Sequence, residues 1–420
     1  MKEKTGSEEG AKRAFLVSIR EEKMSTQEAD SLSKELNSLV NTLGLEIVSQ
    51  EQVYLRQMHA RYGMGTGKAE ELAEKAAALE ADCIIFDKDI SPSQQRNWEN
   101  LSGIPIVDRQ GLIIQIFASR ARSREAELQV RLAELVYALP RLQHKYIDLS
   151  QQRGGHYGSR GSGETRLETD RRQVEQRIHR LEEELEDVKR QRQVQRKQRE
   201  RQGIPVCALV GYTNAGKSTI LNALTGAGVL AEDKLFATLD STSRKLELPL
   251  GKQILLVDTV GFIRRLPHNL INAFRSTLEE VSRATLVINV LDASNADIAM
   301  QYETTKAVLR DIGAETIPMI TVLNKTDLLE TEMDVMLNRY PESIPISAIG
   351  GKGLAELCEK IEYFLSGEEK CYRFPPDRTD LAALVHRTGQ VISELYGDDF
   401  IEIKAKLDER NAGRLKEYQY

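Results

Sequence analysis

Residues 209–224 read LVGYTNAGKSTILNAL, an apolar run that ends in a glycine-rich turn and resumes as an apolar-periodic segment. The turn matches the pattern G-x4-G-K-[ST], with a predicted strand (PVCALV) before it and a predicted helix after it. In such a turn backbone N–H groups converge on phosphate oxygens, a lysine adds positive charge, and a serine offers its hydroxyl to Mg²⁺. The predicted phosphate-binding residues are Gly211, Tyr212, Thr213, Asn214, Ala215, Gly216, Lys217 and Ser218.

A second motif indicates which base accompanies the phosphates. In TVLNKTDL (321–328) an apolar strand leads into a short polar run. A buried carboxylate at Asp327 can accept the N1 and N2 hydrogens of guanine, whereas adenine offers no such pair and would leave the acid unpaired. In PISAIG (345–350) a strand is followed by residues suited to backbone contact with the base. We therefore expect GTP and GDP as ligands, with base contacts from Asn324, Lys325, Thr326, Asp327, Ser347, Ala348 and Ile349.

Two segments between these motifs are candidates to sense the terminal phosphate. QILLVDTVGF (253–262) is an apolar strand that delivers Asp258, Thr259, Val260 and Gly261. Asp258 can hold Mg²⁺ through water, and Gly261 can approach the phosphate because it lacks a Cβ. LFATLDSTSR (235–244) contributes the remaining predicted nucleotide contacts, Phe236, Ala237, Thr238, Leu239 and Asp240.

The metal site is expected to contain Ser218, Thr238 and Asp258. Thr238 is the preferred second hydroxyl ligand of Mg²⁺, and Thr242 is the alternative. We expect the loop that carries Thr238 to become ordered with triphosphate and to relax after hydrolysis.

The residue after the D-x-x-G motif is Phe262, where many related enzymes have a glutamine that positions the attacking water. A phenyl ring cannot orient water through a hydrogen bond, so we assign no catalytic residue and predict slow turnover by the chain alone. A neighbouring side chain, a cation or a group from a partner is expected to complete catalysis. Arg264 and Arg265 are interpreted as surface or partner-contacting residues in preference to internal arginine fingers, and His268 as the entry residue of a helix.

Taken in order, GYTNAGKS, FATLDST, DTVGF, NKTD and SAI resemble the motif set of translation-factor-related P-loop GTPases. The wording of DTVGFIRRLPHNLINAFRSTLEE (258–280) resembles the HflX family of the Obg-HflX branch, as do YGMGTGKAEEL (62–72) and GSRGSGETRLETDRR (158–172). The resemblance covers most of residues 13–366. It implies a GTPase whose amino-terminal region and glycine loop bind the large (50S) ribosomal subunit, and whose GTP-bound form can separate ribosomal subunits. It also leaves open adenine-nucleotide use by the amino-terminal region.

The chain is expected to be an α/β protein of four parts. Residues 1–110 predict a small parallel α/β domain, because the short β-type runs AFLVSI, LEIVSQ, CIIFD and IPIVD alternate with helical patterns. Residues 111–201 predict an antiparallel helical coiled-coil hairpin with a glycine-rich loop at 153–163. Residues 202–367 predict the P-loop GTPase domain, with a mixed, mostly parallel sheet and flanking helices. Residues 368–420 predict a small α+β domain.

The hairpin and the tail carry more detailed expectations. The helical pattern runs from about Gly111 to Asp148, and heptad spacing follows in the second helix. The first helix is expected to face the second with Leu128, Leu132, Leu135, Leu139 and Leu142. In the tail, LAALVHRTGQVISELY (381–396) predicts one helix and FIEIKAKL (400–407) a strand.

A second glycine-rich run, GMGTGK (63–68), superficially suggests another nucleotide site. It lacks the four residues that a phosphate loop has between its first glycine and the Gly-Lys pair. We interpret it as a glycine turn that opens a helix.

The net charge of −6 argues against a generally basic surface, yet positive charge is concentrated mid-chain. VKRQRQVQRKQRER (188–201) and SRARSR (119–124) are joined by five arginines in and beside the glycine loop, Arg153, Arg160, Arg166, Arg171 and Arg172. A phosphate backbone is the predicted partner. The resemblance to the HflX family implies that this backbone is ribosomal RNA. The charge run could also be a helix that simply faces solvent. The alternative function is a regulatory GTP sensor that acts on a protein or a membrane surface, and an NTPase acting on a metabolite ranks last.

Composition bounds the remaining function classes. No apolar run approaches the roughly 18 residues needed to span a bilayer, and the amino terminus is polar where a signal peptide would be apolar. The four cysteines are isolated, without zinc-ligand spacing. These features predict a cytoplasmic protein without stable membrane insertion. We also expect it to be monomeric.

Overall fold

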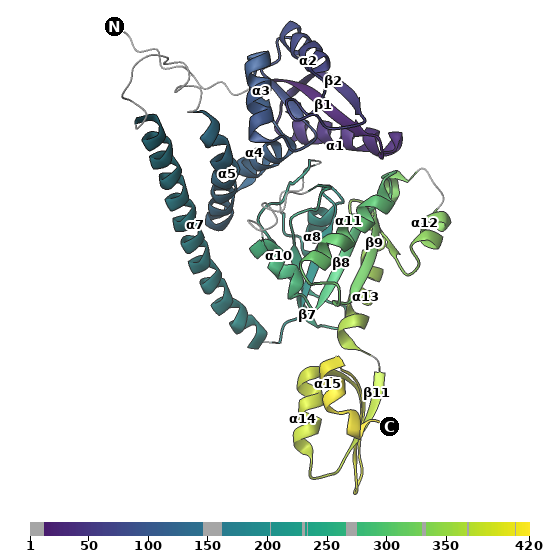
Figure 1. The fold of residues 1–420 in the computed structure, drawn as a ribbon. Helices are drawn as coiled ribbons and strands as arrows, with labels where there is room; N and C mark the ends of the chain where they lie inside the picture. Colours follow the sequence, from purple (N-terminus) through teal and green to yellow (C-terminus); the bar gives the residue numbers. More distant parts are fainter. Residues whose placement is uncertain are drawn as a thin grey trace. The chain divides into compact units, whose positions relative to one another are not determined.

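The computed structural model describes residues 12–145, 162–201, 203–228, 232, 234–265, 275–329, 333–367, 369–407 and 409–420 (Figure 1). The chain forms two compact units that are each discontinuous in sequence. The first comprises Met1–Gln198, Glu232–Asp240 and Ile263–Thr277, and the second comprises Arg199–Ala231, Ser241–Phe262 and Leu278–Tyr420.

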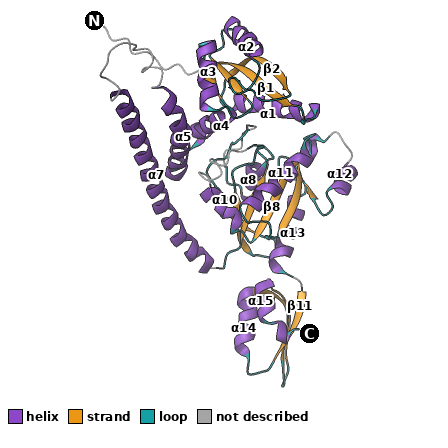
Figure 2. Ribbon diagram, in the orientation of Figure 1, coloured by secondary structure: helices purple, strands orange, loops and turns teal. Residues whose placement is uncertain are grey.

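A four-stranded parallel sheet organises the first unit, with the order β2-β1-β3-β4 (Figure 2). Its strands are β1 (Arg13–Glu21), β2 (Glu46–Leu55), β3 (Cys83–Phe86) and β4 (Ile106–Val107). The connections contain α1 (Thr26–Thr42), α2 (Thr66–Ala78) and α3 (Pro92–Ser102), and α4 (Arg109–Arg120) follows the last strand. The four strands lie where the sequence predicts them, and the α/β class is confirmed.

The core of this sheet forms because β1 and β3 are apolar on both faces, as a parallel sheet covered by helices requires. Trp98 on α3 is fully buried against Phe86 and Tyr62, and its indole N–H donates to the Tyr62 carbonyl at 2.9 Å. The turn at 63–68 opens α2, with Gly65 at the N-cap, as predicted. Lys68 of this turn pairs with Glu71 at 2.8 Å.

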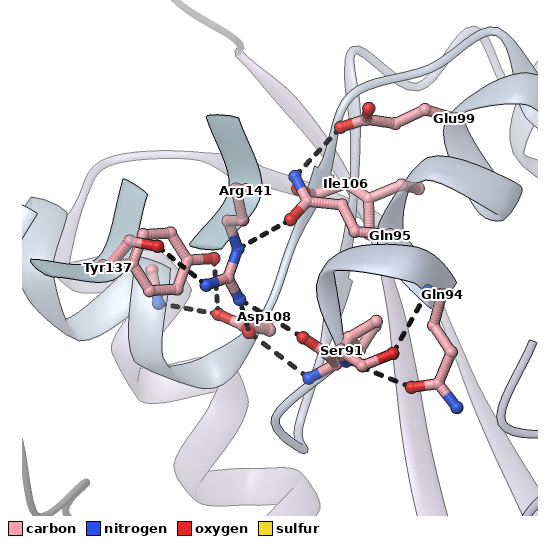
Figure 3. Close-up of polar contacts among 10 residues, drawn as sticks. Ser91, Gln94, Gln95, Glu99, Ile106, Asp108, Tyr137 and Arg141 are labelled. Carbon is pink, nitrogen blue, oxygen red and sulfur yellow. Dashed lines mark hydrogen bonds and ion pairs between the residues drawn. The ribbon is translucent and has the colours of Figure 1, made fainter. Parts of the chain in front are cut away.

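Asp108, at the end of β4, joins three elements through one buried carboxylate (Figure 3). One oxygen accepts hydrogen bonds from the Gly111 N–H and the Tyr137 hydroxyl, each at 2.8 Å. The other accepts from Arg141 at 2.8 Å and from the Ile90 N–H at 3.3 Å. This network fixes the helix that follows α4 against the carboxyl edge of the sheet.

The helical region is divided differently from the prediction. A continuous helix from 111 is wrong: α4 ends at Arg120, and α5 (Arg124–Lys145) begins after a short break. Ser123 begins the new helix, because its hydroxyl accepts from the Ala126 N–H at 3.1 Å. The long helix α7 spans Ser162–Arg201, and Arg124 on α5 pairs with Glu184 on α7 at 2.7 Å. Residues 146–161, with most of the predicted glycine loop, lie outside the described residues.

A six-stranded sheet organises the second unit, in the order β10-β9-β8-β5-β7-β6. All neighbours are parallel except β6 and β7, which pair antiparallel. The strands are β5 (Val206–Gly211), β6 (Thr242–Glu247), β7 (Gln253–Asp258), β8 (Leu286–Asp292), β9 (Met319–Asn324) and β10 (Ile344–Pro345). The helices are α8 (Lys217–Thr225), α10 (Arg275–Ser282), α11 (Ile298–Asp311), α12 (Met333–Arg339), α13 (Leu354–Ser366) and the short η1 (Thr326–Leu328). This is the predicted mixed, mostly parallel sheet.

The carboxyl-terminal residues form a three-stranded antiparallel sheet, β11-β13-β12, with its own apolar core. Its elements are β11 (Glu369–Phe374), α14 (Thr379–Thr388), β12 (Gly389–Tyr396), β13 (Ile401–Leu407), α15 (Glu409–Arg414) and η2 (Lys416–Tyr418). The predicted helix over 381–396 is wrong in its second half. Gly389 ends α14, and a side chain there would come within 2.2 Å of Leu407, so the chain continues as a strand paired with β13.

Candidate functional site

The phosphate loop occupies the turn between β5 and α8, as the sequence predicts. The Lys217 ammonium donates to the carbonyl of Tyr212 at 2.9 Å and to that of Gly211 at 3.3 Å, so it lies across the loop. Burial lowers the pKa of Lys217 to about 8, although the nearby Asp258 carboxylate acts to raise it. The phosphate loop therefore holds an ammonium group whose charged form phosphate oxygens would stabilise.

Two glycines of the loop are required by their surroundings. Gly216 has φ +93°, and a Cβ there would come within 2.2 Å of the Asn324 amide nitrogen. Gly211 has φ +141°, and a Cβ there would come within 2.2 Å of the Val290 carbonyl oxygen. The motif glycines thus serve both the turn itself and the close approach of neighbouring strands.

Ser218 and Asp258 meet at the start of α8. The Ser218 hydroxyl donates to the Asp258 carboxylate at 2.6 Å, and Asp258 is completely buried at the end of β7. A hydroxyl and a carboxylate are the hard oxygen donors that Mg²⁺ prefers, so these two residues fit the predicted metal. Among the described residues no group of three or more His, Cys, Asp or Glu side chains forms another candidate metal site.

The segment after Asp258 lies against the phosphate loop. A Cβ on Gly261 would come within 2.7 Å of the Thr213 Cα and 3.0 Å of the Lys217 ammonium, so only glycine fits there. Phe262 donates its N–H to the Gly211 carbonyl at 3.0 Å, and its carbonyl accepts from Thr213 at 2.8 Å. Its ring is 2 % exposed. The position that would orient water is thus filled by a buried apolar ring.

The predicted base-recognition motifs are brought together at one edge of the sheet. Asn324 donates to the Ala215 carbonyl at 2.9 Å and accepts from the Ala348 N–H at 3.1 Å. The Ser347 hydroxyl donates to Asp327 at 2.6 Å. These bonds join the phosphate loop to the two predicted base motifs.

Two features of this edge differ from the sequence interpretation. Asp327 is exposed to solvent and not buried, since it lies in the short helix η1, which contains no buried residue. Sequence reasoning also missed Asp292, which ends β8 and pairs with Lys325 at 2.8 Å. The acid that closes the apolar run LVINVLD was the available signal for Asp292.

The segment that carries Thr238 belongs to the first unit, whereas Thr242 starts β6 and lies opposite Asp258 in the antiparallel ladder. Phe236 packs edge-on against Phe117, with the ring centroids 4.7 Å apart. The choice of Thr238 as metal ligand stays a prediction.

Asp240, the last residue of that segment, binds the two residues that precede α5. Its carboxylate accepts from the Ser123 hydroxyl, and from the N–H groups of Ser123 at 3.0 Å and Arg122 at 3.2 Å, at the amino end of α5. The predicted nucleotide contacts of 236–240 also stay predictions, since the side chains of Phe236 and Asp240 are engaged within the first unit.

Comparison with known proteins identifies related GTPases. The chain is 43 % identical over 414 residues to the "GTPase HflX" of Akkermansia muciniphila, an alignment that covers 95 % of each chain. The chain belongs to the HflX family of GTPases. It is 41 % identical to the HflX protein of Escherichia coli K12 over 372 residues, which is 87 % of each chain.

Family models match three successive regions of this HflX chain. Residues 30–118 match "GTP-binding GTPase N-terminal", 120–199 match "GTP-binding GTPase Middle Region", and 206–325 match "50S ribosome-binding GTPase". A crystal structure of a GTP-binding protein from Sulfolobus solfataricus in complex with GDP aligns with a TM-score of 0.46 at 24 % identity, over 83 % of this chain and 97 % of that one. The GTPase HflX relatives and the matching GTPase family model show that the chain is a guanine-nucleotide-binding, GTP-hydrolysing enzyme, and the family prediction made from its motifs is confirmed.

Proposed function

We propose that this HflX chain associates with the large ribosomal subunit and its rRNA, and dissociates or rescues ribosomes in a GTP-dependent manner. The proposal is supported by the family of the chain and by the "50S ribosome-binding GTPase" model that its nucleotide-binding region matches. One structural observation carries it: two described segments in or beside the nucleotide motifs, 234–240 and 263–265, belong to the same compact unit as the amino-terminal α/β domain. Nucleotide-dependent change in those segments must therefore alter their packing in the amino-terminal unit, which the family resemblance gives as the ribosome-binding part.

Most residues proposed for the chemistry belong to the second unit, whereas Thr238 belongs to the first. Ser218 and Asp258 would hold Mg²⁺, with Thr238 as the proposed third ligand. When bound, the ion would neutralise negative charge on the phosphate oxygens. Lys217 keeps an ammonium beside the loop, and Gly261 lets the backbone approach the terminal phosphate. Because Phe262 cannot orient water, we expect slow hydrolysis by the chain alone and acceleration on the ribosome.

The basic residues expected to meet RNA are engaged to different degrees. Arg120 is half-buried and pairs with Glu232 at 2.9 Å, whereas Arg124 and Arg171 are exposed and pair with Glu184 and Glu175. Exposed ion pairs of this kind contribute little to the stability of the fold. These two arginines can therefore exchange a carboxylate for a phosphate at a small cost in free energy. Arg153, Arg160, the side chain of Arg166, and His268 lie outside the described residues.

A sucrose-gradient profile of ribosomes tests the proposal. Whole ribosomes are incubated with the protein and GTP, a nonhydrolysable analogue, or GDP. Loss of whole ribosomes with the triphosphates but not with GDP is expected. Unchanged profiles in all three would remove subunit separation from the function.

Cosedimentation distinguishes the proposal from a GTP sensor that acts on a protein or a membrane. Phosphate contacts weaken steeply with salt, so binding to RNA should be lost between about 50 and 200 mM salt and after RNase treatment. Binding that survives both treatments would favour the sensor.

Among the described residues no helix has the length and apolar character needed to cross a bilayer. We place the protein in the cytoplasm as part of this proposal.

A further inference from the structure

A cluster of buried charges lies beside the segment that follows the D-x-x-G motif. Glu35, on α1, accepts from the Arg109 guanidinium and pairs with Arg264 at 3.3 Å. Arg264 also donates to the Ser31 hydroxyl, one turn earlier on α1, at 2.7 Å. Arg109 in addition donates to the main-chain carbonyl of Arg264 at 3.1 Å. The segment is thus held through both its side chain and its backbone, and all four residues belong to the first unit.

The burial of these groups makes the loss of any one of them costly. The side chains of Arg109, Glu35 and Arg264 are 1 %, 8 % and 13 % exposed. Removing one partner of a buried ion pair costs far more than removing a surface pair, because the remaining charge stays desolvated. Without the Glu35 carboxylate, two cations would face each other in a site that solvent scarcely reaches. The interpretation of Arg264 as a surface residue is therefore wrong.

The held residue is close along the chain to the phosphate sensor. Arg264 follows Gly261 by three residues, a span of at most about 11 Å of extended chain. Phe262, between them, is fixed by two main-chain hydrogen bonds to the phosphate loop. Phe262 is thus held by the phosphate loop within the second unit, and Arg264 by Glu35 and Arg109 within the first, with one residue between them along the chain.

We propose that Glu35 and Arg109 are positioning residues of the GTPase reaction, which hold Arg264 so that Gly261 is preorganised for the terminal phosphate. Gly261 is proposed to contact the terminal phosphate, which GDP lacks. Loss of the anchor therefore lowers the affinity for triphosphate, which must then order the segment itself, and leaves the affinity for GDP unchanged. The inference does not depend on ribosome binding, since it concerns the hydrolysing site alone.

The same geometry argues against Arg264 as an internal arginine finger. A finger must bring its guanidinium to the transferring phosphoryl group. Here the guanidinium is occupied by Glu35 and Ser31, and the Arg264 carbonyl by Arg109. The two roles predict opposite behaviour for Glu35 variants: loss of Glu35 weakens a positioning anchor but frees a finger.

The test uses the full-length purified chain without ribosomes. Glu35→Gln removes the charge of the anchor, and Ser31→Ala is a milder variant that removes one hydrogen bond to Arg264 and keeps every charge. Arg264→Ala removes the held side chain, and Arg264→Lys restores its charge. Glu51→Gln is the matched control, because Glu51 lies on β2 of the same domain and pairs with a partly exposed Lys75 at 3.1 Å. Thermal unfolding shows which variants are folded.

Affinities for GDP and for a nonhydrolysable GTP analogue are measured with single-turnover hydrolysis rates. For Glu35→Gln we expect the ratio of triphosphate to diphosphate affinity to fall about 3- to 30-fold, in the range of measured coupling along contact networks. Ser31→Ala should give a smaller fall in the same direction, Arg264→Lys should recover part of the loss, and Glu51→Gln should match the parent. The double variant Glu35→Gln/Arg264→Ala should be no worse than Arg264→Ala alone.

Three results would overturn the proposal. The first is an unchanged affinity ratio in both Glu35→Gln and Ser31→Ala. The second is equal loss of GDP and triphosphate binding, which indicates a purely structural role. The third is faster hydrolysis in Glu35→Gln together with slower hydrolysis in Arg264→Ala, which would identify Arg264 as a finger.

Discussion

Replacement of Asp327 by asparagine tests the base assignment most directly. The Ser347 hydroxyl donates to one oxygen of the Asp327 carboxylate at 2.6 Å. In Asp327→Asn the same hydroxyl needs an acceptor, so the amide oxygen takes that place and the NH2 group is directed elsewhere. That group is a donor, and the N1–H and N2–H groups of guanine are donors as well. Xanthine has a carbonyl oxygen in place of the guanine N2 amine and can accept from it.

The size of the effect follows from the hydrogen bonds that are lost. Each bond to a charged acceptor contributes about 1.5–3 kcal/mol, and two are lost in Asp327→Asn. Because Asp327 is exposed, we take the lower limit, which gives about 3 kcal/mol, or roughly 100-fold in affinity.

Competition binding of GDP and xanthosine diphosphate, to the parent chain and to Asp327→Asn, measures this exchange. We expect GDP to weaken roughly 100-fold and xanthosine diphosphate to strengthen. Ser347→Ala, which keeps the carboxylate, should lose less than about tenfold. If Asp327→Asn bound GDP within a factor of about three of the parent, or if the parent bound ADP as well as GDP, the assignment of Asp327 to the base would be refuted.

Three further predictions concern other parts of the molecule. Burial lowers the pKa of Lys217 to about 8, and bound phosphates favour its charged form. GDP binding at about pH 8.5–9 should therefore take up a proton, and the affinity should weaken as the pH rises. Calorimetry in two buffers of different ionisation enthalpy measures the number of protons taken up. Burial raises the pKa of Asp87 from 3.8 to about 6, so the folded state binds the proton more tightly than the unfolded state does. The free energy of unfolding should therefore fall as the pH rises from about 4 to 6. Over that interval urea unfolding should show Asp87→Asn becoming more stable than the parent by at most about 3 kcal/mol. Gly216→Ala should lose GDP binding, because its Cβ would meet the Asn324 amide at 2.2 Å, whereas Gly226→Ala, with a similarly positive φ and open space, should keep it; equal loss in both would mean that backbone strain and not the contact decides.

The sequence predicted the parts of the fold that repeat a local pattern. Apolar strands such as Cys83–Phe86 and Gln253–Asp258 are visible because a buried parallel strand needs an uninterrupted apolar run. The phosphate loop is visible because its chemistry requires glycine and lysine at fixed spacing. The second half of 381–396 was missed because the close approach of Gly389 to Leu407 is a long-range contact, which no local pattern records.

The site was predicted with the same division. Residue types that the ligand itself demands, such as Lys217 and Asp327, could be named from spacing alone. Glu35 and Arg109 could not, because an acid within an amphipathic helix and an arginine after a strand look like ordinary surface residues until the fold places them together. The exposure of Asp327 was likewise missed, because it depends on which side of a three-residue helix faces solvent.

The discontinuity of the two compact units has a practical consequence for dissection of the protein. A fragment that starts at Arg199 would look like a complete nucleotide-binding module, yet it would carry Phe236, Asp240 and Arg264 without Phe117, Ser123 and Glu35. One aromatic ring and two charged side chains on the loops beside the nucleotide motifs would then lack their contacts. Rates measured on such a truncation would describe a molecule with altered loops, and point substitutions in the intact chain are the sounder way to separate the roles of its parts.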